Sequence, residues 1–264
     1  MLLKGMHGRA AMIQQKVEIR FEKSEAIRFI SHHDLMRAIM RAVRRARLPV
    51  RLTEGFNPRP RIVFPVALEV GIASLDEVAE IELTECLVLQ EVSRRLSSAF
   101  PPGLILKAVT ELPPRRAGQI PSRMRYRLHL TEAGIQVAPA SLRTLLEAGS
   151  LPFQRPREDH IQDVDLRPAL LDLSLDPQGD LLVDVKPAQR GSARPLEVLS
   201  LLLNCPLSNL KNVRVTKLLM ELLPPPELSE EAQAERKVLL ERAARSKAPS
   251  AEPQPVEPEA ELDN

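Results

Sequence analysis

Hydrophobic and polar residues alternate along many segments of this chain with the period of a β-strand. In residues 16–23, apolar side chains at every second position alternate with charged ones, which predicts a strand with one buried face. Pro65 interrupts another such segment and favours an edge position for it, because proline cannot donate a hydrogen bond to a sheet. Strands are predicted over residues 16–23, 50–53, 61–68, 77–84, 103–110, 123–130, 166–175, 181–187 and 213–222.

Apolar residues three and four positions apart predict four helices. The best marked of them begins at about His32, because Ser31 and Asp34 form the signature of a capping box. It is predicted to end before Pro49, since the residue that precedes a proline is disfavoured in a helix. The other three helices are predicted over residues 88–100, 139–148 and 195–204.

The order of these elements predicts a mixed α+β fold. Strand, helix, strand, strand, helix and strand follow one another in the first half, and the second half repeats this order roughly. That is the order of a ferredoxin-like domain, so two tandem ferredoxin-like domains are expected. The predicted divisions are a flexible extension (1–14), the first domain (15–112), a linker (113–122), the second domain (123–224) and an acidic, largely disordered tail rich in Pro, Glu and Ala (225–264).

The formal net charge of +2 conceals an uneven distribution along the chain. Residues 1–61 contain fourteen Lys and Arg against five Asp and Glu, a net charge of +9, whereas residues 227–264 contain five against ten. Positive charge gathered in one part of a chain is typical of surfaces that bind RNA or other polyanions. No apolar run reaches the roughly 20 residues of a membrane helix, and no signal peptide is recognisable, so a cytoplasmic protein without a membrane segment is expected.

The predicted helix after Ser31 and the loop after residue 53 carry most of this positive charge. The helix has an apolar side and an arginine side, and the prolines of the loop Glu54-Gly-Phe-Asn-Pro-Arg-Pro-Arg61 stiffen it. We predict an anion-binding or RNA-binding surface here; the alternative is that the arginines only solvate an outer helix face. The predicted binding residues of this surface are Arg37, Arg41, Arg44, Arg45, Arg51, Asn57, Arg59 and Arg61.

The segment Gln189-Arg-Gly-Ser-Ala-Arg-Pro195 is a second candidate for anion binding. It leads into a predicted helix, whose first N–H groups are free to bind a phosphate. Arg190, Ser192 and Arg194 are the predicted binding residues. The alternative is structural, because the start of a helix favours small residues in any case.

His32 is the one candidate for catalysis, as a general base in RNA cleavage or modification. Neighbouring helical residues diverge by about 100°, so His32 and His33 are poorly placed to share a metal ion. The alternative is a capping or surface histidine. No metal site and no cofactor is predicted.

The segment Phe29-Ile-Ser-His-His-Asp-Leu-Met-Arg and the Glu-Gly-Phe-Asn-Pro loop resemble the opening signature of the radical-SAM-linked domain family, and Gly191-Ser-Ala-Arg-Pro-Leu-Glu-Val-Leu199 resembles its closing one. This bacterial family has no known function and occurs alone or attached to radical SAM proteins. His33 stands where the family more often has Leu. The resemblance implies a separate radical SAM protein as a partner. With only Cys86 and Cys205, the chain cannot supply the three cysteines of a CxxxCxxC cluster motif and is not itself a radical SAM enzyme.

Three hypotheses about function follow. The first is a non-catalytic RNA-binding or accessory protein that works beside a radical SAM protein in RNA modification or translation-related metabolism. The second is an RNA-processing or RNA-modifying enzyme that uses His32. The third is a protein-interaction scaffold whose arginines meet an acidic partner.

Overall fold

The computed structural model describes residues 14–54, 56–113, 118–156, 160–187, 193–223 and Val238. The chain divides into two compact units, residues 1–227 and 228–264. All the elements below belong to the first unit. Predictions about residues 1–13 and about the acidic tail (225–264), apart from Val238, lie outside the described residues.

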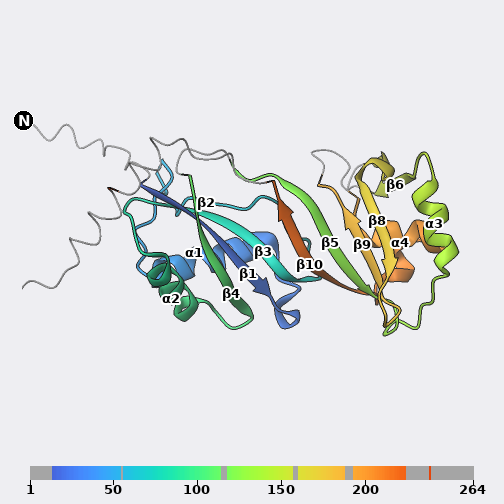
Figure 1. The fold of residues 1–264 in the computed structure, drawn as a ribbon, viewed down its shortest axis with the longest axis horizontal. Coiled ribbons are helices and arrows are strands. Elements are labelled where there is room, and N and C mark those ends of the chain that lie inside the picture. The colour runs from blue at the N-terminus through green and yellow to red at the C-terminus, as the bar shows by residue number, and fades with distance from the viewer. Residues whose placement is uncertain are drawn as a thin grey trace, which may run out of the picture. The chain divides into compact units, whose positions relative to one another are not determined.

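One mixed sheet runs through the first unit (Figure 1). In spatial order its strands are β4 (Leu104–Leu112), β1 (Gln15–Lys23), β3 (Ile72–Leu83), β10 (Arg214–Leu222), β5 (Pro121–His129), β9 (Leu181–Val185) and β8 (Leu170–Leu175), with β2 (Ile62–Val63) also paired to β3. A separate two-stranded sheet joins β6 (Pro152–Pro156) and β7 (Ile161–Asp165). The predicted mixed α+β class is therefore confirmed.

In the first half, helices α1 (His32–Arg45) and α2 (Leu89–Ala99) cover one face of β1 and β3. Alternate residues of β1 and of the second half of β3 lie in the core that the helices complete, as the alternating pattern predicts: Val17, Ile19, Phe21, Ala79, Ile81 and Leu83. The 3₁₀ turn η1 (Glu25–Ile27) connects β1 to α1. The charged residues between them, such as Glu18, Glu80 and Glu82, point to the face of the sheet opposite α1 and α2, which we call the open face.

In the second half, helices α3 (Pro139–Glu147) and α4 (Pro195–Leu203) contribute to a second core with β5, β8, β9 and β10. The short turns η2 (Arg167–Ala169) and η3 (Leu207–Leu210) precede β8 and β10. The two halves meet where β10 runs parallel to β3, with Val215 opposite Ile72 and Lys217 opposite Ser74. Residues from both halves thus form one continuous sheet.

Several predicted boundaries need correction. The predicted strand over residues 50–53 is reduced to isolated bridges, from Val50 to Leu83 and from Leu52 to Pro60. The predicted strand from residue 166 starts at Leu170, because Pro168 lies in the turn η2. The β6–β7 hairpin was not predicted, since prolines at both ends of β6 and its polar residues give no alternating apolar signal.

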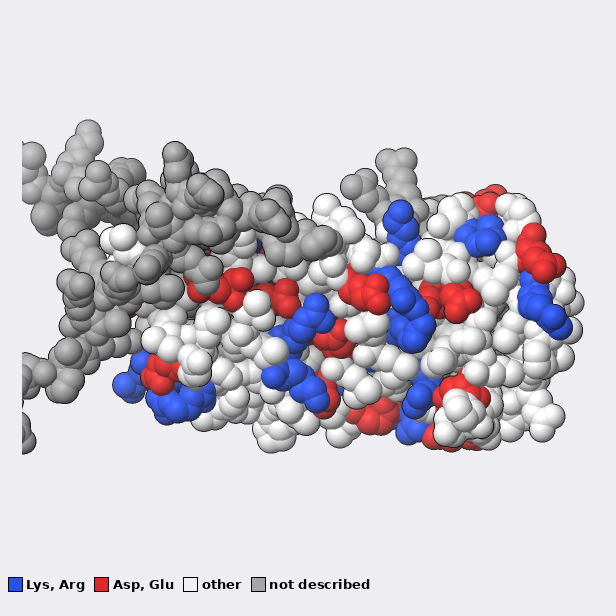
Figure 2. Space-filling model, in the orientation of Figure 1, with Lys and Arg blue, Asp and Glu red and all other residues white. Residues whose placement is uncertain are grey.

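The open face of the sheet is covered with paired charges. Lys16 contacts Glu80 at 2.5 Å, and Arg20 contacts Asp76 at 2.8 Å. Gln119, which lies in the predicted linker, donates its backbone N–H to Glu80. In Figure 2, basic and acidic groups alternate over the middle of the sheet. No helix in the described part of the chain has the length and apolar content needed to cross a membrane.

Candidate functional site

Helix α1 begins with the predicted cap. The Ser31 hydroxyl accepts a hydrogen bond from the N–H of Asp34 at 3.1 Å and donates to the Asp34 carboxylate at 2.8 Å. This bond from Ser31, supported by Arg37, lowers the pKa of Asp34. The cap therefore fixes where the helix starts and sets the phase of the side chains that follow.

The two sides of α1 differ as the sequence predicts. Its buried residues are Leu35, Ala38, Ile39, Ala42 and Val43, and they pack on β1 and β3. Arg37, Arg41 and Arg44 follow one another at helical spacing on the exposed side. Arg37 forms an exposed ion pair with Asp34 at 3.2 Å, whereas Arg41 and Arg44 have no ion pair with any residue the structure describes. We call these three residues the α1 arginine stripe.

The C-terminal end of α1 leads from this stripe toward α2. Arg45 donates a hydrogen bond to the carbonyl oxygen of Ala99 at the end of α2. A shallow depression lies between the two helices, lined by Arg45, Ala46, Arg47, Glu91, Arg94, Arg95 and Ser98. Sequence reasoning missed Arg94 and Arg95 as site residues, although adjacent arginines in a predicted helix were a visible signal.

The loop after residue 53 is the tip of a narrow hairpin. The N–H of Arg61 donates to the carbonyl of Arg51 at 2.8 Å, and the N–H of Thr53 donates to the carbonyl of Arg59 at 2.8 Å. Phe56, Asn57 and Arg59 are exposed beyond these bonds. The structure therefore presents the side chains of the tip outward.

The side chains of Arg51 and Arg61 lie away from the α1 arginine stripe. Both contact the Glu82 carboxylate, at 3.1 Å each. Glu82 lies between Ile81 and Leu83, which point into the core under α1, so Glu82 lies on the open face. The structure thus brings Arg37, Arg41, Arg44 and Arg45 together on α1 and does not bring Arg51 or Arg61 to them.

His32 is half-buried at the start of α1. Its ring packs edge-on against Phe64, with 5.2 Å between ring centroids. Burial, followed by the nearby charge of His33, lowers the pKa of His32. Its Nδ1 atom is buried and has no hydrogen-bond partner in the described part of the chain. The imidazole is therefore neutral near neutral pH.

Of the second predicted site, the structure describes Arg194 only; Arg190 and Ser192 lie outside the described residues. Arg194 precedes α4 and contacts Glu69 at 2.9 Å. Burial raises the pKa of Glu69, and the charge of Arg194 opposes this rise. The Arg194 guanidinium is therefore already engaged by a carboxylate.

A comparison with protein-family models matches residues 16–195 to a family described as an uncharacterized protein conserved in bacteria, DUF2344. The chain belongs to this family. The match to DUF2344 includes α1, the hairpin, α2 and the elements from β4 to β9, and it ends at the first residue of α4. A comparison with curated proteins finds no match. The predicted membership of an uncharacterised bacterial family is confirmed, and the link to radical SAM proteins stays a prediction.

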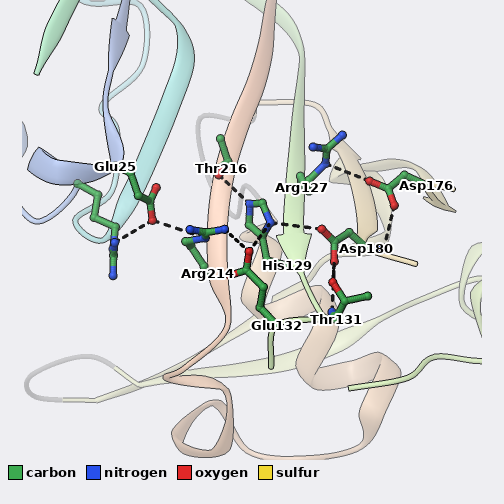
Figure 3. Close-up of polar contacts among 10 residues, drawn as sticks. Glu25, Arg127, His129, Thr131, Glu132, Asp176, Asp180, Arg214 and Thr216 are labelled. Carbon is green, nitrogen blue, oxygen red and sulfur yellow. Dashed lines mark hydrogen bonds and ion pairs between the residues drawn. The ribbon is translucent and has the colours of Figure 1, made fainter. Parts of the chain in front are cut away.

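The part of the chain that matches DUF2344 also contributes to a polar network that sequence reasoning missed (Figure 3). His129 contacts the Thr216 hydroxyl through Nε2 at 3.0 Å and Asp180 through Nδ1 at 3.3 Å. Burial acts to raise the pKa of Asp180, but its bonds from Thr131 and the charge of His129 outweigh this effect and lower it. Arg214 contacts both Glu132 of the second half and Glu25 of the first.

Each charged group of this network has a partner within it, so the network connects β5, β10 and η1 rather than presenting a free charge. The sequence offered no signal for it, because its members come from distant segments. Together, the α1 arginine stripe and the adjoining depression hold seven arginines against two carboxylates, Asp34 and Glu91.

Proposed function

We propose that this protein is a non-catalytic RNA-binding accessory protein of the cytoplasm that holds RNA through the α1 arginine stripe. The observation that carries the proposal is the exposure of Arg41 and Arg44 without an ion pair among the described residues. A carboxylate that already pairs with an arginine competes with phosphate for it. Two free guanidinium groups on one rigid helix are therefore available to phosphate oxygens.

The expected contacts are to the phosphate backbone rather than to base edges. Phosphate contacts supply affinity without sequence information, and they weaken as salt concentration rises. Aromatic residues make up 3% of the chain, and Phe21 lies fully buried in the core, so stacking of bases on the sheet is not expected. Binding should therefore tolerate changes of RNA sequence.

The proposed architecture is a pair of ferredoxin-like units that share one sheet. In the first half, the chain order is β1, α1, β2, β3, α2, β4. In the second, the order β5, α3, β8, β9, α4, β10 is the same once the β6–β7 hairpin is set aside as an insertion. Function still has to be argued from the surface, because this architecture serves many functions.

A separate radical SAM protein is the proposed partner, and RNA modification or translation-related metabolism is the proposed setting. The resemblance of residues 29–37 and 191–199 to the radical-SAM-linked signatures supports this partner. In this arrangement the present chain would hold the RNA while the partner carries out the chemistry.

The test is RNA binding by Arg41→Ala and Arg44→Ala, measured by fluorescence anisotropy over a range of salt concentrations. We expect each substitution to weaken binding to all single-stranded RNA sequences alike and to reduce the slope of log Kd against log salt by about 0.7. Arg143→Ala is the matched control, because Arg143 is an exposed arginine of α3 that also has no ion pair among the described residues. Equal effects of all three substitutions would contradict the proposal.

A second candidate function, RNA cleavage or modification, has one observation in its favour. The lowered pKa of His32 keeps its imidazole neutral, as a general base must be. His32→Ala separates the two functions when RNA binding and RNA turnover are measured together. A non-catalytic binder shows no turnover in either form, whereas an enzyme loses turnover and keeps binding.

A further inference from the structure

Helix α1 ends in a motif in which glycine is usual. The N–H of Leu48 donates to the carbonyl of Val43, and the N–H of Arg47 donates to the carbonyl of Arg44. This pair of bonds defines a Schellman motif, whose left-handed position is usually occupied by glycine. Arg47 occupies it here, with a φ of 50°. A side chain in that conformation carries a steric cost that glycine avoids.

The side chain placed at this strained position lines the depression between α1 and α2. Four arginines line it, Arg45, Arg47, Arg94 and Arg95, against one carboxylate, Glu91. Hydrogen bonds from Arg94 at 2.8 Å and Arg95 at 2.7 Å lower the pKa of Glu91 to about 2, so Glu91 is ionised. The lining therefore has a formal charge of +3 at neutral pH.

The four guanidinium groups are not equally available. Arg94 and Arg95 share Glu91, and Arg45 donates to the carbonyl of Ala99. The Arg47 guanidinium has no hydrogen bond or ion pair with any residue the structure describes. The side chain of Arg95 contacts Arg47 at its backbone carbonyl, at 3.5 Å. Arg47 is therefore the group with the most unused donor capacity in the depression.

We propose that this depression is a phosphate subsite and that Arg47 is its principal ligand. The proposal rests on the proposed function, because the phosphate group is one carried by the RNA that the α1 arginine stripe holds. Arg45 lines the depression and follows Arg41 of the stripe by four residues in α1, so the stripe and the subsite are neighbours on the surface of the helix. A volume of about 370 Å³ lies at the lower end of the range for ligand sites, which suits one phosphate group with its sugar.

The backbone strain at Arg47 allows stability and binding to be separated. Arg47→Gly removes the steric strain of a side chain in the left-handed conformation, so we expect the melting temperature to rise by about 2–4 °C. The same substitution removes the free guanidinium, so we expect RNA affinity to fall about tenfold. A loss of binding that accompanies a gain of stability cannot be explained by misfolding.

The chain provides a matched control for this experiment. Asn204 follows α4 in the same left-handed conformation, with a φ of 47°, and the N–H of Cys205 donates to the carbonyl of Ser200 as in α1. Asn204→Gly relieves the same kind of strain without removing a charge. We expect it to leave RNA affinity unchanged. Unchanged RNA affinity in folded Arg47→Gly would overturn the subsite.

Inorganic phosphate distinguishes failure of the subsite from failure of RNA binding. We expect phosphate alone to shift the NMR signals of Arg47, Arg94 and Arg95 in the full chain and to leave those of Arg47→Gly unshifted at positions 94 and 95. If RNA does not bind, the proposed function fails while this phosphate result still supports the subsite. If phosphate shifts none of these signals, the subsite fails even if RNA binds the α1 arginine stripe.

RNA oligonucleotides with a 5′-phosphate and with a 5′-hydroxyl identify the source of the phosphate group. Tighter binding of the 5′-phosphorylated RNA that disappears in Arg47→Gly assigns the subsite to a chain end. Equal affinity of the two RNAs, with the same loss in Arg47→Gly, assigns it to an internal phosphodiester. Both results support the subsite.

Discussion

At the scale of single residues, the arginines of this protein differ in whether a carboxylate reaches them. Arg41, Arg44 and Arg47 have no ion pair in the described chain, whereas Arg51 and Arg61 share Glu82. All five look alike in the sequence. Net charge therefore predicts that a region is basic but not which of its guanidinium groups can bind a ligand.

Glu91 gives a prediction about pH at this scale. Its pKa of about 2 lies below the ordinary value of 4.5 because Arg94, and then Arg95, bond to the ionised carboxylate. A depressed pKa stabilises the folded state above pH 4.5, and this contribution is lost as pH falls from about 4.5 toward 2. We expect Arg94→Ala to raise the pKa of Glu91 toward 4.5.

NMR titration of the Glu91 carboxyl group measures this pKa directly. Glu91→Gln should be less stable than the native chain at pH 6 and should lose less stability on acidification across the same interval. A Glu91 pKa near 4.5 in the native chain would show that the bonds from Arg94 and Arg95 do not persist in solution.

At the scale of elements, arginines that are close together in the sequence lie on different surfaces of the protein, some on α1 and some on the hairpin after it. The arginines of α1 lie on the exposed side of the helix, away from the sheet. Arg51 and Arg61, at the base of the hairpin, bond to Glu82 on the open face of the sheet. The period-two alternation of β3 decides this, because Glu82 must point away from the core that Ile81 and Leu83 enter.

Two variants with equal loss of charge test this separation. Arg51→Ala/Arg61→Ala leaves the Glu82 side chain, 10% exposed, without its guanidinium partners. We expect it to lower the free energy of unfolding by roughly 1–3 kcal/mol and to weaken RNA binding only slightly. We expect Arg41→Ala/Arg44→Ala to weaken RNA binding strongly and to leave the free energy of unfolding nearly unchanged. The reason is that those side chains are exposed and have no ion pair within the described chain. Urea denaturation and RNA anisotropy measure the two effects, and identical results for both variants would contradict the separation.

At the scale of the whole first unit, the pairing of β3 with β10 joins the two halves in one sheet. Lys217 of β10 forms an ion pair with Glu77 of β3, and each side chain is 1% exposed. Lys23 lies buried beside them and donates to the carbonyls of Arg28 and Ile72 at 2.7 and 3.2 Å. Burial lowers the pKa of Lys23. Charge is therefore buried at the junction, where an unpaired group is costly.

Lys217→Met should destabilise the first unit strongly. It leaves the Glu77 carboxylate buried without its partner, and we expect a loss of about 3–5 kcal/mol in the free energy of unfolding. Lys217→Met/Glu77→Leu should recover much of that loss, because no unpaired charge remains. Urea denaturation measures both variants, and a double variant less stable than the single one would argue against this explanation.

Tyr126 reports whether the junction couples the two halves. It is the one tyrosine of the chain, the chain has no tryptophan, and Tyr126 is buried in the second half. Tyr126 fluorescence therefore follows the second half alone, whereas far-UV circular dichroism follows both. We expect the two urea transitions to coincide in the native chain and to separate in Lys217→Met.

The amino-acid sequence by itself determined the helices α1 to α4, most strands of the large sheet and the residue at which α1 begins. Alternation along β1 and β3, apolar spacing along α1 and the Ser31 cap depend on residues close together in the chain, so local patterns suffice to predict them. The same patterns identified Arg37, Arg41 and Arg44 as the exposed side of α1.

Only the tertiary structure decided which distant groups meet. Arg51 bonds to Glu82, which is thirty-one positions away in the sequence. Arg47 lines the same depression as Arg94 and Arg95. Strand β10 pairs with β3 rather than remaining in a separate sheet. These contacts depend on how helices and strands pack across the core, and neither periodicity nor charge counts carry that information. The left-handed Arg47 belongs here too, because Pro49 marks the end of α1 in the sequence without revealing that an arginine takes the place of glycine.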